Sequence, residues 1–317
     1  MGGDAATPSW PTLPPTPPRP SPVTSLEELV SSPETLRRRL EGTGYLADDG
    51  IATALFCAVR LPQPLLLEGE AGVGKTEAAK ALAEVLETPL VRLQCYEGID
   101  AAEALYEWDF PRQLLAIRLA EAGGEALGTG DLFSRDYLIA RPLLRAAEHP
   151  GPRPAVLLVD EIDRADDEFE AFLLELLAES TVTIPELGTL RATHPPIVVL
   201  TSNRTRDLHD ALKRRCLYHW IDYPDIERTA EIIRRRVPAG RASLAEQVAA
   251  AVARLRTLDV QKPPGVAEAI DWAHALGLLG VEQLDGPAVL ATSGSVLKYR
   301  EDLGAVAERG AAWVAGE

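Results

Sequence analysis

The 317-residue chain has few cysteines, and its basic residues are outnumbered by acidic ones. Cys57, Cys95 and Cys216 stand far apart, and neither a CxxC pair nor a metal-ligand spacing of the five histidines occurs. A disulfide framework and a zinc site are therefore not expected. With 32 Lys and Arg against 48 Asp and Glu, the formal charge is −16. Binding nucleic-acid phosphates needs clustered cations, so nucleic acid is not the expected partner, although a local basic patch stays open.

Long apolar runs are also lacking. No stretch approaches the roughly 18 apolar residues of a membrane span. The N-terminus lacks the basic start and apolar stretch of a secretory signal, so we expect a soluble cytoplasmic protein without a membrane partner. Apolar residues nevertheless make up 46% of the chain, which permits a sizeable core, and the length suits about two domains.

Composition divides the chain into three parts. Eight prolines fall between Pro8 and Pro22, so residues 1–24 are predicted to be a disordered or polyproline-like tail, and a role as a ligand for a partner stays open. Residues 25–224 alternate between strand and helix patterns, which favours a parallel sheet covered by helices. Residues 225–317 show helix patterns and no strand pattern. The predicted fold class is therefore an α/β P-loop domain followed by a small all-helical domain.

Local signals place the predicted elements. Ser25 with Glu28, and Ser32 before Pro33, are helix-start signals, and Ser243 with Glu246 forms another. Helices are predicted at 33–40, 48–60, from about Arg206 to 213, and at 264–279. Short apolar runs predict buried strands at 65–67, 90–94, 155–159, 197–201 and 217–221.

The strongest motif runs from Gly69 to Thr76 and fits GxxxxGK[ST] in full, between a predicted strand and a predicted helix. Its glycines let successive N–H groups point at phosphate oxygens, next to a helix N-terminus. Lys75 is expected to reach the β- and γ-phosphates of ATP, and the Thr76 hydroxyl to bind Mg²⁺. The predicted phosphate-binding residues are Gly69, Glu70, Ala71, Gly72, Val73, Gly74, Lys75 and Thr76.

Two carboxylates follow the strand at 155–159. In open α/β sheets ligands bind at the carboxyl ends of the strands. We therefore expect Asp160 to hold Mg²⁺ and Glu161 to polarise the attacking water. The acids after them, Asp163 and the run 166–168, lack the spacing of a calcium loop and are interpreted as a solvated acidic turn with a helix cap.

Two weaker signals lie further along. Asn203 ends the strand at 197–201, where an amide can bond a γ-phosphate or the water. Arg214 and Arg215 end a predicted helix, where cations are favoured in any case. The alternative reading is an arginine finger given to a neighbouring subunit's ATP.

These motifs in this order, followed by helices, resemble the AAA+ ATPases. The segments 157–177, 181–190 and 199–225 resemble the MoxR subfamily more closely, in particular the MoxR-type ATPases that accompany maturation of molybdenum hydroxylases such as carbon monoxide dehydrogenase. The resemblance covers about residues 30–305.

The resemblance implies a hexameric ring with ATP at subunit interfaces and a chaperone-like remodelling activity. It implies a partner with a von Willebrand factor A domain and a metalloenzyme client. By motif position, Asn203 is the γ-phosphate sensor, and Arg215 is the finger, with Arg214 as the alternative. Residues 181–191 correspond to a hairpin facing the ring pore, and residues 96–140 include the family's helix insertion.

One position departs from the family pattern. Val266 stands where the family has an arginine at the start of a C-terminal helix, and Lys262 is a candidate substitute. The departure keeps a second hypothesis open, a nucleotide-gated scaffold with negligible turnover. A nucleic-acid-linked AAA+ motor is a third, which the net charge disfavours.

Overall fold

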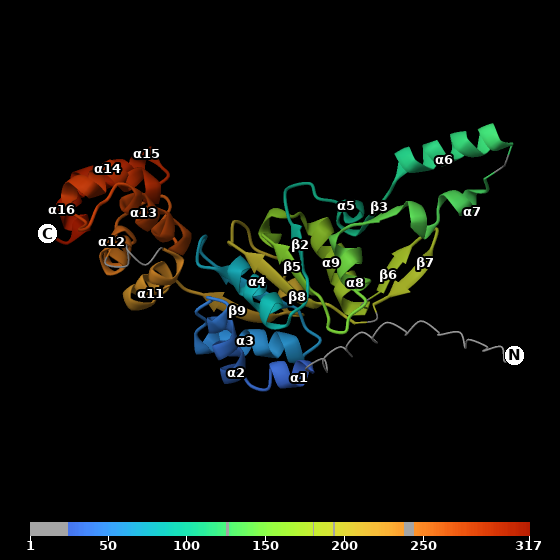
Figure 1. Ribbon diagram of the computed structural model, residues 1–317, viewed down its shortest axis with the longest axis horizontal. Coiled ribbons are helices and arrows are strands. Elements are labelled where there is room, and N and C mark those ends of the chain that lie inside the picture. The colour runs from blue at the N-terminus through green and yellow to red at the C-terminus, as the bar shows by residue number, and fades with distance from the viewer. Residues whose placement is uncertain (1–24, 125–126, 180, 193, 238–243) are drawn as a thin grey trace, which may run out of the picture.

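The computed structural model describes residues 25–124, 127–179, 181–192, 194–237 and 244–317. Its centre is a five-stranded sheet in the order β2-β5-β8-β1-β9, in which every neighbouring pair is parallel (Figure 1). The strands are β1 Leu65–Gly69, β2 Leu90–Gln94, β5 Val156–Asp160, β8 Ile197–Ser202 and β9 Leu217–Ile221. The predicted parallel sheet is confirmed, and the third strand extends one residue further to include Asp160.

Helices cover both faces of this sheet. One face packs against α2 Pro33–Gly42, α3 Asp49–Arg60 and α4 Lys75–Val85, and the other against α8 Pro142–Ala147 and α9 Asp167–Glu179 (Figure 1). Successive side chains of a strand point to opposite faces, so Leu65 and Leu67 enter the first core and Leu66 the second. Burial on both sides explains why these strands are continuous apolar runs in the sequence.

The predicted helix starts at the N-terminal end are confirmed. Ser25 and Glu28 form a reciprocal capping box on α1 Leu26–Leu29. The Ser32 side chain caps α2, with Pro33 in its first turn. Asp48 caps α3 in the same way by accepting from the Ile51 N–H. The predicted tail, residues 1–24, lies outside the described residues.

Two segments leave the sheet on the side away from the C-terminus. Residues 96–124 and 127–140 form a small subdomain, from which α6 projects (Figure 1). Phe110, Leu114, Leu115 and Leu119 are exposed along α6. Residues 181–191 form the predicted hairpin, β6 Thr181–Ile184 paired antiparallel with β7 Gly188–Arg191. The elements of the subdomain are α5 Ala101–Leu105, β3 Tyr106–Trp108, α6 Phe110–Gly123, α7 Thr129–Leu132, η1 Arg135–Tyr137 and β4 Leu138–Ala140.

After β9 the described chain is helical. The C-terminal helices, as we call α11–α16, gather at the opposite end of the molecule from α6 (Figure 1). They enclose a core of their own around the fully buried Trp272. The predicted cap residue Ser243 lies outside the described residues. The helices are α11 Ile226–Arg236, α12 Ala245–Leu255, α13 Val266–Leu278, α14 Gly286–Val296, α15 Arg300–Arg309 and α16 Ala311–Ala315. Within the described ranges, none of the helices has the length and apolar character needed to cross a membrane.

The helix predicted from Arg206 is wrong over its first turn. Only α10, Asp210–Lys213, is helical there. The Arg206 guanidinium pairs instead with Glu170 and donates to the Ala165 carbonyl, and Glu170 also accepts from the His209 N–H. Glu170 is only 1% exposed, so this ion pair with α9 fixes a non-helical segment where the sequence pattern favoured a helix.

Candidate nucleotide-binding site

The phosphate motif forms the turn between β1 and α4, as the sequence predicts. A Cβ at Gly69 would lie 2.4 Å from the Ile221 carbonyl oxygen, so only glycine fits beside β9. Gly74 has a φ of 101° and ends the turn just before α4, in the left-handed region that glycine adopts without strain. The turn therefore presents the N-terminus of α4 to whatever occupies the loop.

Lys75 points back across this turn. It is 7% exposed, and its Nζ donates to the Gly69 and Glu70 carbonyl oxygens at 2.7 Å each. Burial lowers the pKa of Lys75, while the nearby carboxylates of Asp163 and Glu70 act in the opposite direction. The ammonium is thus held over the loop by two carbonyls, a position from which it can turn to phosphate oxygens.

Asp160 and Thr76 meet at the end of β5. The Thr76 hydroxyl donates to Asp160 Oδ1 at 3.0 Å, and the Thr201 hydroxyl donates to the same oxygen at 2.5 Å. The Arg92 guanidinium on β2 donates to Asp160 Oδ2 at 2.9 Å through Nε. Asp160 is 3% exposed, so these donors, and not water, satisfy its charge.

This donor set fits Mg²⁺. The described residues contain no cluster of three His, Cys, Asp or Glu that would hold a metal by itself. One carboxylate and one hydroxyl are what Mg²⁺ takes from a protein when substrate phosphates and water complete its shell. The oxygen ligands predicted for it, Thr76 and Asp160, lie together at the phosphate loop.

Glu161 is aimed by its backbone and by two donors. Its φ is 56°, a left-handed conformation that is uncommon for a residue with a side chain. Gln94 Nε2 donates to Glu161 Oε2 at 3.0 Å, and Arg164 donates to the same oxygen at 3.2 Å. Its own N–H donates to the Thr201 hydroxyl at 2.9 Å. Strained residues held by their surroundings are typical of functional sites.

The acidic turn after Glu161 is not solvated throughout. Asp163 is 2% exposed and accepts from the Asn203 and Thr205 N–H groups, at 3.2 and 2.8 Å. The sequence interpretation of Asp163 is therefore wrong, because it took no account of the loop after β8. Asp166 does cap α9, by accepting from the Phe169 N–H, and residues 166–168 are exposed as expected.

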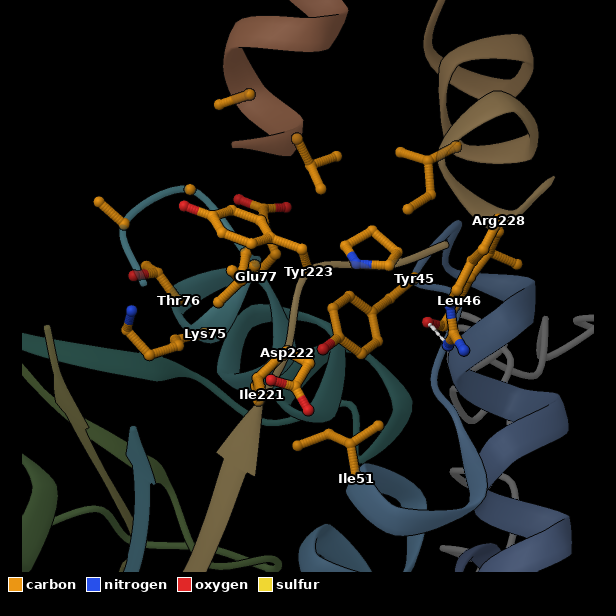
Figure 2. Close-up of a pocket in the computed structure, with 18 of the residues that line it drawn as sticks. Tyr45, Leu46, Ile51, Lys75, Thr76, Glu77, Ile221, Asp222, Tyr223 and Arg228 are labelled. Atoms are coloured by element: carbon orange, nitrogen blue, oxygen red, sulfur yellow. Dashed lines mark hydrogen bonds between the residues drawn. The ribbon is translucent and has the colours of Figure 1, made fainter. Parts of the chain in front are cut away.

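A cavity of about 1060 Å³ joins these residues to the C-terminal helices. Lys75, Thr76, Asp160, Glu161 and Asn203 all line it. Figure 2 shows Lys75 and Thr76 on one side, Arg228 with Leu46 on the other, and Tyr45 between them. Further lining residues that the sequence did not single out are Tyr45, Leu46, Ile51, His219, Tyr223, Arg228 and Arg236. They belong to no motif, because the fold alone brings α3, β9 and α11 together.

The first turn of α13 docks on the phosphate loop. The Val266 N–H donates to the Gly72 carbonyl at 2.9 Å, and a Cβ at Gly265 would lie 2.8 Å from the Ala71 carbonyl oxygen. Val266 is buried and lines the cavity, whereas Lys262 is exposed and does not line it. The cations that α11 contributes to the cavity lining are Arg228 and Arg236.

Arg214 and Arg215 lie apart from this cavity. Both are exposed at the end of α10, and neither lines the cavity. The Arg215 guanidinium donates to the Leu174 carbonyl at 3.3 Å. These side chains therefore do not complete the site of their own chain.

Comparison with known proteins finds a family similarity over most of the sheet domain. Residues 64–216 match the family model of the AAA domain, dynein-related subfamily. The chain is 25% identical over 186 residues to the chaperone protein ClpB of Mycoplasma pneumoniae, a match to 57% of this chain but only 23% of that chaperone. It is 25% identical over 243 residues to an uncharacterized protein of Staphylococcus haemolyticus, covering 73% of this chain and 84% of that one.

Among solved structures, the RuvB Holliday junction branch migration motor of Thermotoga maritima aligns with a TM-score of 0.43 and 18% identity. This alignment covers 86% of the present chain and 71% of the RuvB chain. The phosphate loop, the carboxylates at the end of β5, the parallel sheet and the family match agree with one another. Residues 64–216 of this chain are thus similar to the AAA domain of the dynein-related subfamily, and the geometry of the site agrees with that similarity.

Proposed function

We propose that this chain binds and hydrolyses ATP and uses the energy to remodel a protein client. One observation carries the proposal: Lys75, Thr76, Asp160 and Glu161 converge on one cavity beside the glycine-rich turn. The match of residues 64–216 to the AAA family model supports ATPase activity in general. The proposed domains are 25–224 for the nucleotide-binding part and 225–317 for the helical part, with residues 1–24 as a tail.

Each side chain has a proposed role. Lys75 neutralises the β- and γ-phosphates, and the amides of the loop bind their oxygens. Thr76 and Asp160 hold Mg²⁺, which supplies charge neutralisation of the phosphates. Glu161 orients and polarises the attacking water, held in place by Gln94. Asn203, at the edge of the cavity, bonds the γ-phosphate or that water.

The proposed site is completed by a second subunit. Arg214 and Arg215 are exposed and lie outside their own cavity, which supports a role in trans as an arginine finger within a ring, proposed to be a hexamer. Mixing tests this directly. Mixed rings of Arg215→Ala and Glu161→Gln protein should regain ATPase activity that neither variant has alone. If mixed rings form but show no recovery, the arginine finger is Arg214 or neither of the two residues.

The proposed client is a metalloenzyme under maturation, of the molybdenum hydroxylase class, assisted by a partner with a von Willebrand factor A domain. The support is the sequence resemblance to the MoxR subfamily, together with the similarity to a protein named as a chaperone. The three free thiols and the need for ATP fit a cytoplasmic location, which we include in the proposal. Glu161→Gln protein with ATP should retain the client from its native extract. Recovery of nucleic-acid enzymes alone would contradict the assignment.

A nucleotide-gated scaffold is the second candidate, favoured by Val266. A buried valine occupies the first position of α13, where a cation would sense the γ-phosphate. Steady-state turnover separates the two functions, because a scaffold would bind ATP and release little phosphate.

The Lys75→Ala variant tests the site itself. Removing the ammonium should abolish ATP binding, measured by equilibrium dialysis with Mg²⁺ present. Lys80→Ala is the matched control, since Lys80 lies on the same helix but is half-exposed and paired with Glu77. Unchanged binding by Lys75→Ala would refute the proposed cradle, and loss of binding by Lys80→Ala would show that the helix itself was damaged.

A further inference from the structure

Asp163 is a buried carboxylate that the proposed chemistry does not use. It lies in the short helix η2, Ile162–Arg164, directly after Glu161. Its Oδ2 accepts three hydrogen bonds, from the Asn203 N–H at 3.2 Å, the Thr205 N–H at 2.8 Å and the Thr205 hydroxyl at 2.7 Å. All three donors belong to the loop that follows β8. One oxygen atom thus ties the turn after Glu161 to the loop that carries Asn203.

The second carboxylate oxygen of Asp163, Oδ1, is in a different environment from Oδ2. Asp163 Oδ1 is buried, and no hydrogen-bond partner for it occurs among the described residues. Burying a carboxylate costs several kcal/mol unless its oxygens are satisfied. A neutral asparagine could accept from the same N–H groups at a smaller desolvation cost. Stability of the turn alone therefore does not account for an acid at this position.

The loop held by Asp163 needs a restraint. Arg204, between the two donor residues, has a φ of 56°, and such a conformation in a residue other than glycine persists only when its surroundings enforce it. Bonds from N–H groups to a carboxylate are roughly twice as strong as neutral ones. Asn203, the residue before Arg204, lines the cavity. The strained backbone at Arg204 and the hydrogen bonds to Asp163 thus both determine the position of Asn203, which is proposed to bond the γ-phosphate.

We propose that Asp163 is a positioning residue for hydrolysis: it fixes the loop Asn203–Thr205 so that Asn203 is presented to the γ-phosphate end of the cavity. It acts through Asn203 and touches no substrate. This inference rests on the proposed function, because it assigns the restraint to the step in which ATP is cleaved. The attraction between Asp163 and the buried Lys75 ammonium fits its place beside the phosphate loop.

Kinetics of Asp163→Ala in the full chain test the proposal. We expect kcat to fall by about 10- to 100-fold, the usual cost of removing a group that orients a functional residue. KM for ATP should change by less than about 3-fold, since Lys75 keeps its two carbonyl acceptors in the phosphate loop. Asp163→Asn keeps a neutral acceptor and should recover part of kcat. In an Asn203→Ala background, Asp163→Ala should cost less than about 2-fold more, because both act as one unit.

Two variants keep the test interpretable. Asp166→Asn is the matched control: Asp166 lies three residues on and caps α9 without contacting the loop, so kcat should stay at the wild-type value. Thr205→Val removes only the hydroxyl donor and should lower kcat in the same direction by less, which preserves the test if Asp163→Ala does not fold. Independent, additive losses from Asp163→Ala and Asn203→Ala, or a fall in melting temperature with unchanged kcat, would overturn the proposal.

Hydrogen exchange separates this inference from the proposed function. The Asn203 and Thr205 amides should exchange faster in Asp163→Ala than in wild type, while strand amides keep their protection. A wild-type chain that binds ATP but shows no turnover would refute the proposed function, and the exchange result would still decide whether Asp163 holds the loop. Unchanged exchange at both amides would contradict the restraint itself.

Discussion

Gly265→Ala should loosen the contact between the C-terminal helices and the phosphate loop. Gly265 has an ordinary extended backbone, so alanine is permitted there by its φ and ψ angles. Its new Cβ, however, would lie 2.8 Å from both the Ala71 carbonyl oxygen and Gly72 Cα, where ordinary contact begins at 3.4 Å. The first turn of α13 must therefore move away from the phosphate loop by roughly 0.6 Å, because both of these contacts are with backbone atoms.

The retreat has a cost that can be estimated. It would lengthen the hydrogen bond from the Val266 N–H to the Gly72 carbonyl, raising the N···O distance from 2.9 Å to about 3.5 Å, outside the usual range. Losing that bond costs about 0.5–1.5 kcal/mol, and residual crowding adds about as much. The two terms together weaken the contact by about 1–3 kcal/mol, which corresponds to a factor of about 5–150 in an equilibrium constant. We expect the Kd for ATP to rise by this factor, measured by isothermal titration calorimetry.

The control for this variant is Gly304→Ala. Gly304 lies inside α15 with no atom within 4 Å of the added Cβ, so ATP affinity should not change. Its fold should gain about 0.5–1 kcal/mol, because alanine is the better helix residue. Wild-type affinity in Gly265→Ala would refute the claim that the contact between α13 and the phosphate loop contributes to ATP binding.

Three further predictions concern stability and reactivity. Burial lowers the pKa of His219 below 6.5. Between these two pKa values the unfolded chain binds more protons than the folded chain, so stability falls as pH falls. His219→Gln should therefore reduce the drop in melting temperature between pH 7.5 and pH 5.5. Thr292→Val leaves the buried Trp272 Nε1–H, which now donates at 2.7 Å, without an acceptor and should cost about 1–3 kcal/mol by urea denaturation. Burial raises the pKa of Cys95 to about 12, so iodoacetamide at pH 8 should leave this thiol unmodified by mass spectrometry until the chain is unfolded.

Much of the fold could be predicted because its signals are local. Strands buried on both faces are continuous apolar runs, and the caps at Ser25 and Ser32 are decided within four residues. The phosphate loop needs its glycines and Lys75 at fixed spacing, so the sequence alone locates it. Asp160 and Glu161 follow from their place at the end of a strand.

The remainder depended on contacts between distant segments. Nothing near Arg206 indicates that Glu170 will pair with it and replace a helical turn. Asp163 reads as one acid among several, and only the return of the loop after β8 buries it. The role of Arg92 likewise depends on the neighbouring strand β5, because Arg92 pairs with Asp160 at the end of that strand. Such pairings are decided by tertiary structure, which spacing in one sequence does not encode.

The most direct test of ATP hydrolysis at this site compares phosphate release by the wild-type chain and by Glu161→Gln at saturating Mg²⁺ and ATP. Without the carboxylate there is no base to polarise the water, so turnover should fall by about 10²- to 10⁴-fold while ATP affinity persists. Glu168→Gln, an exposed glutamate nearby, should retain wild-type turnover. Equal turnover by Glu161→Gln and wild type would contradict the account.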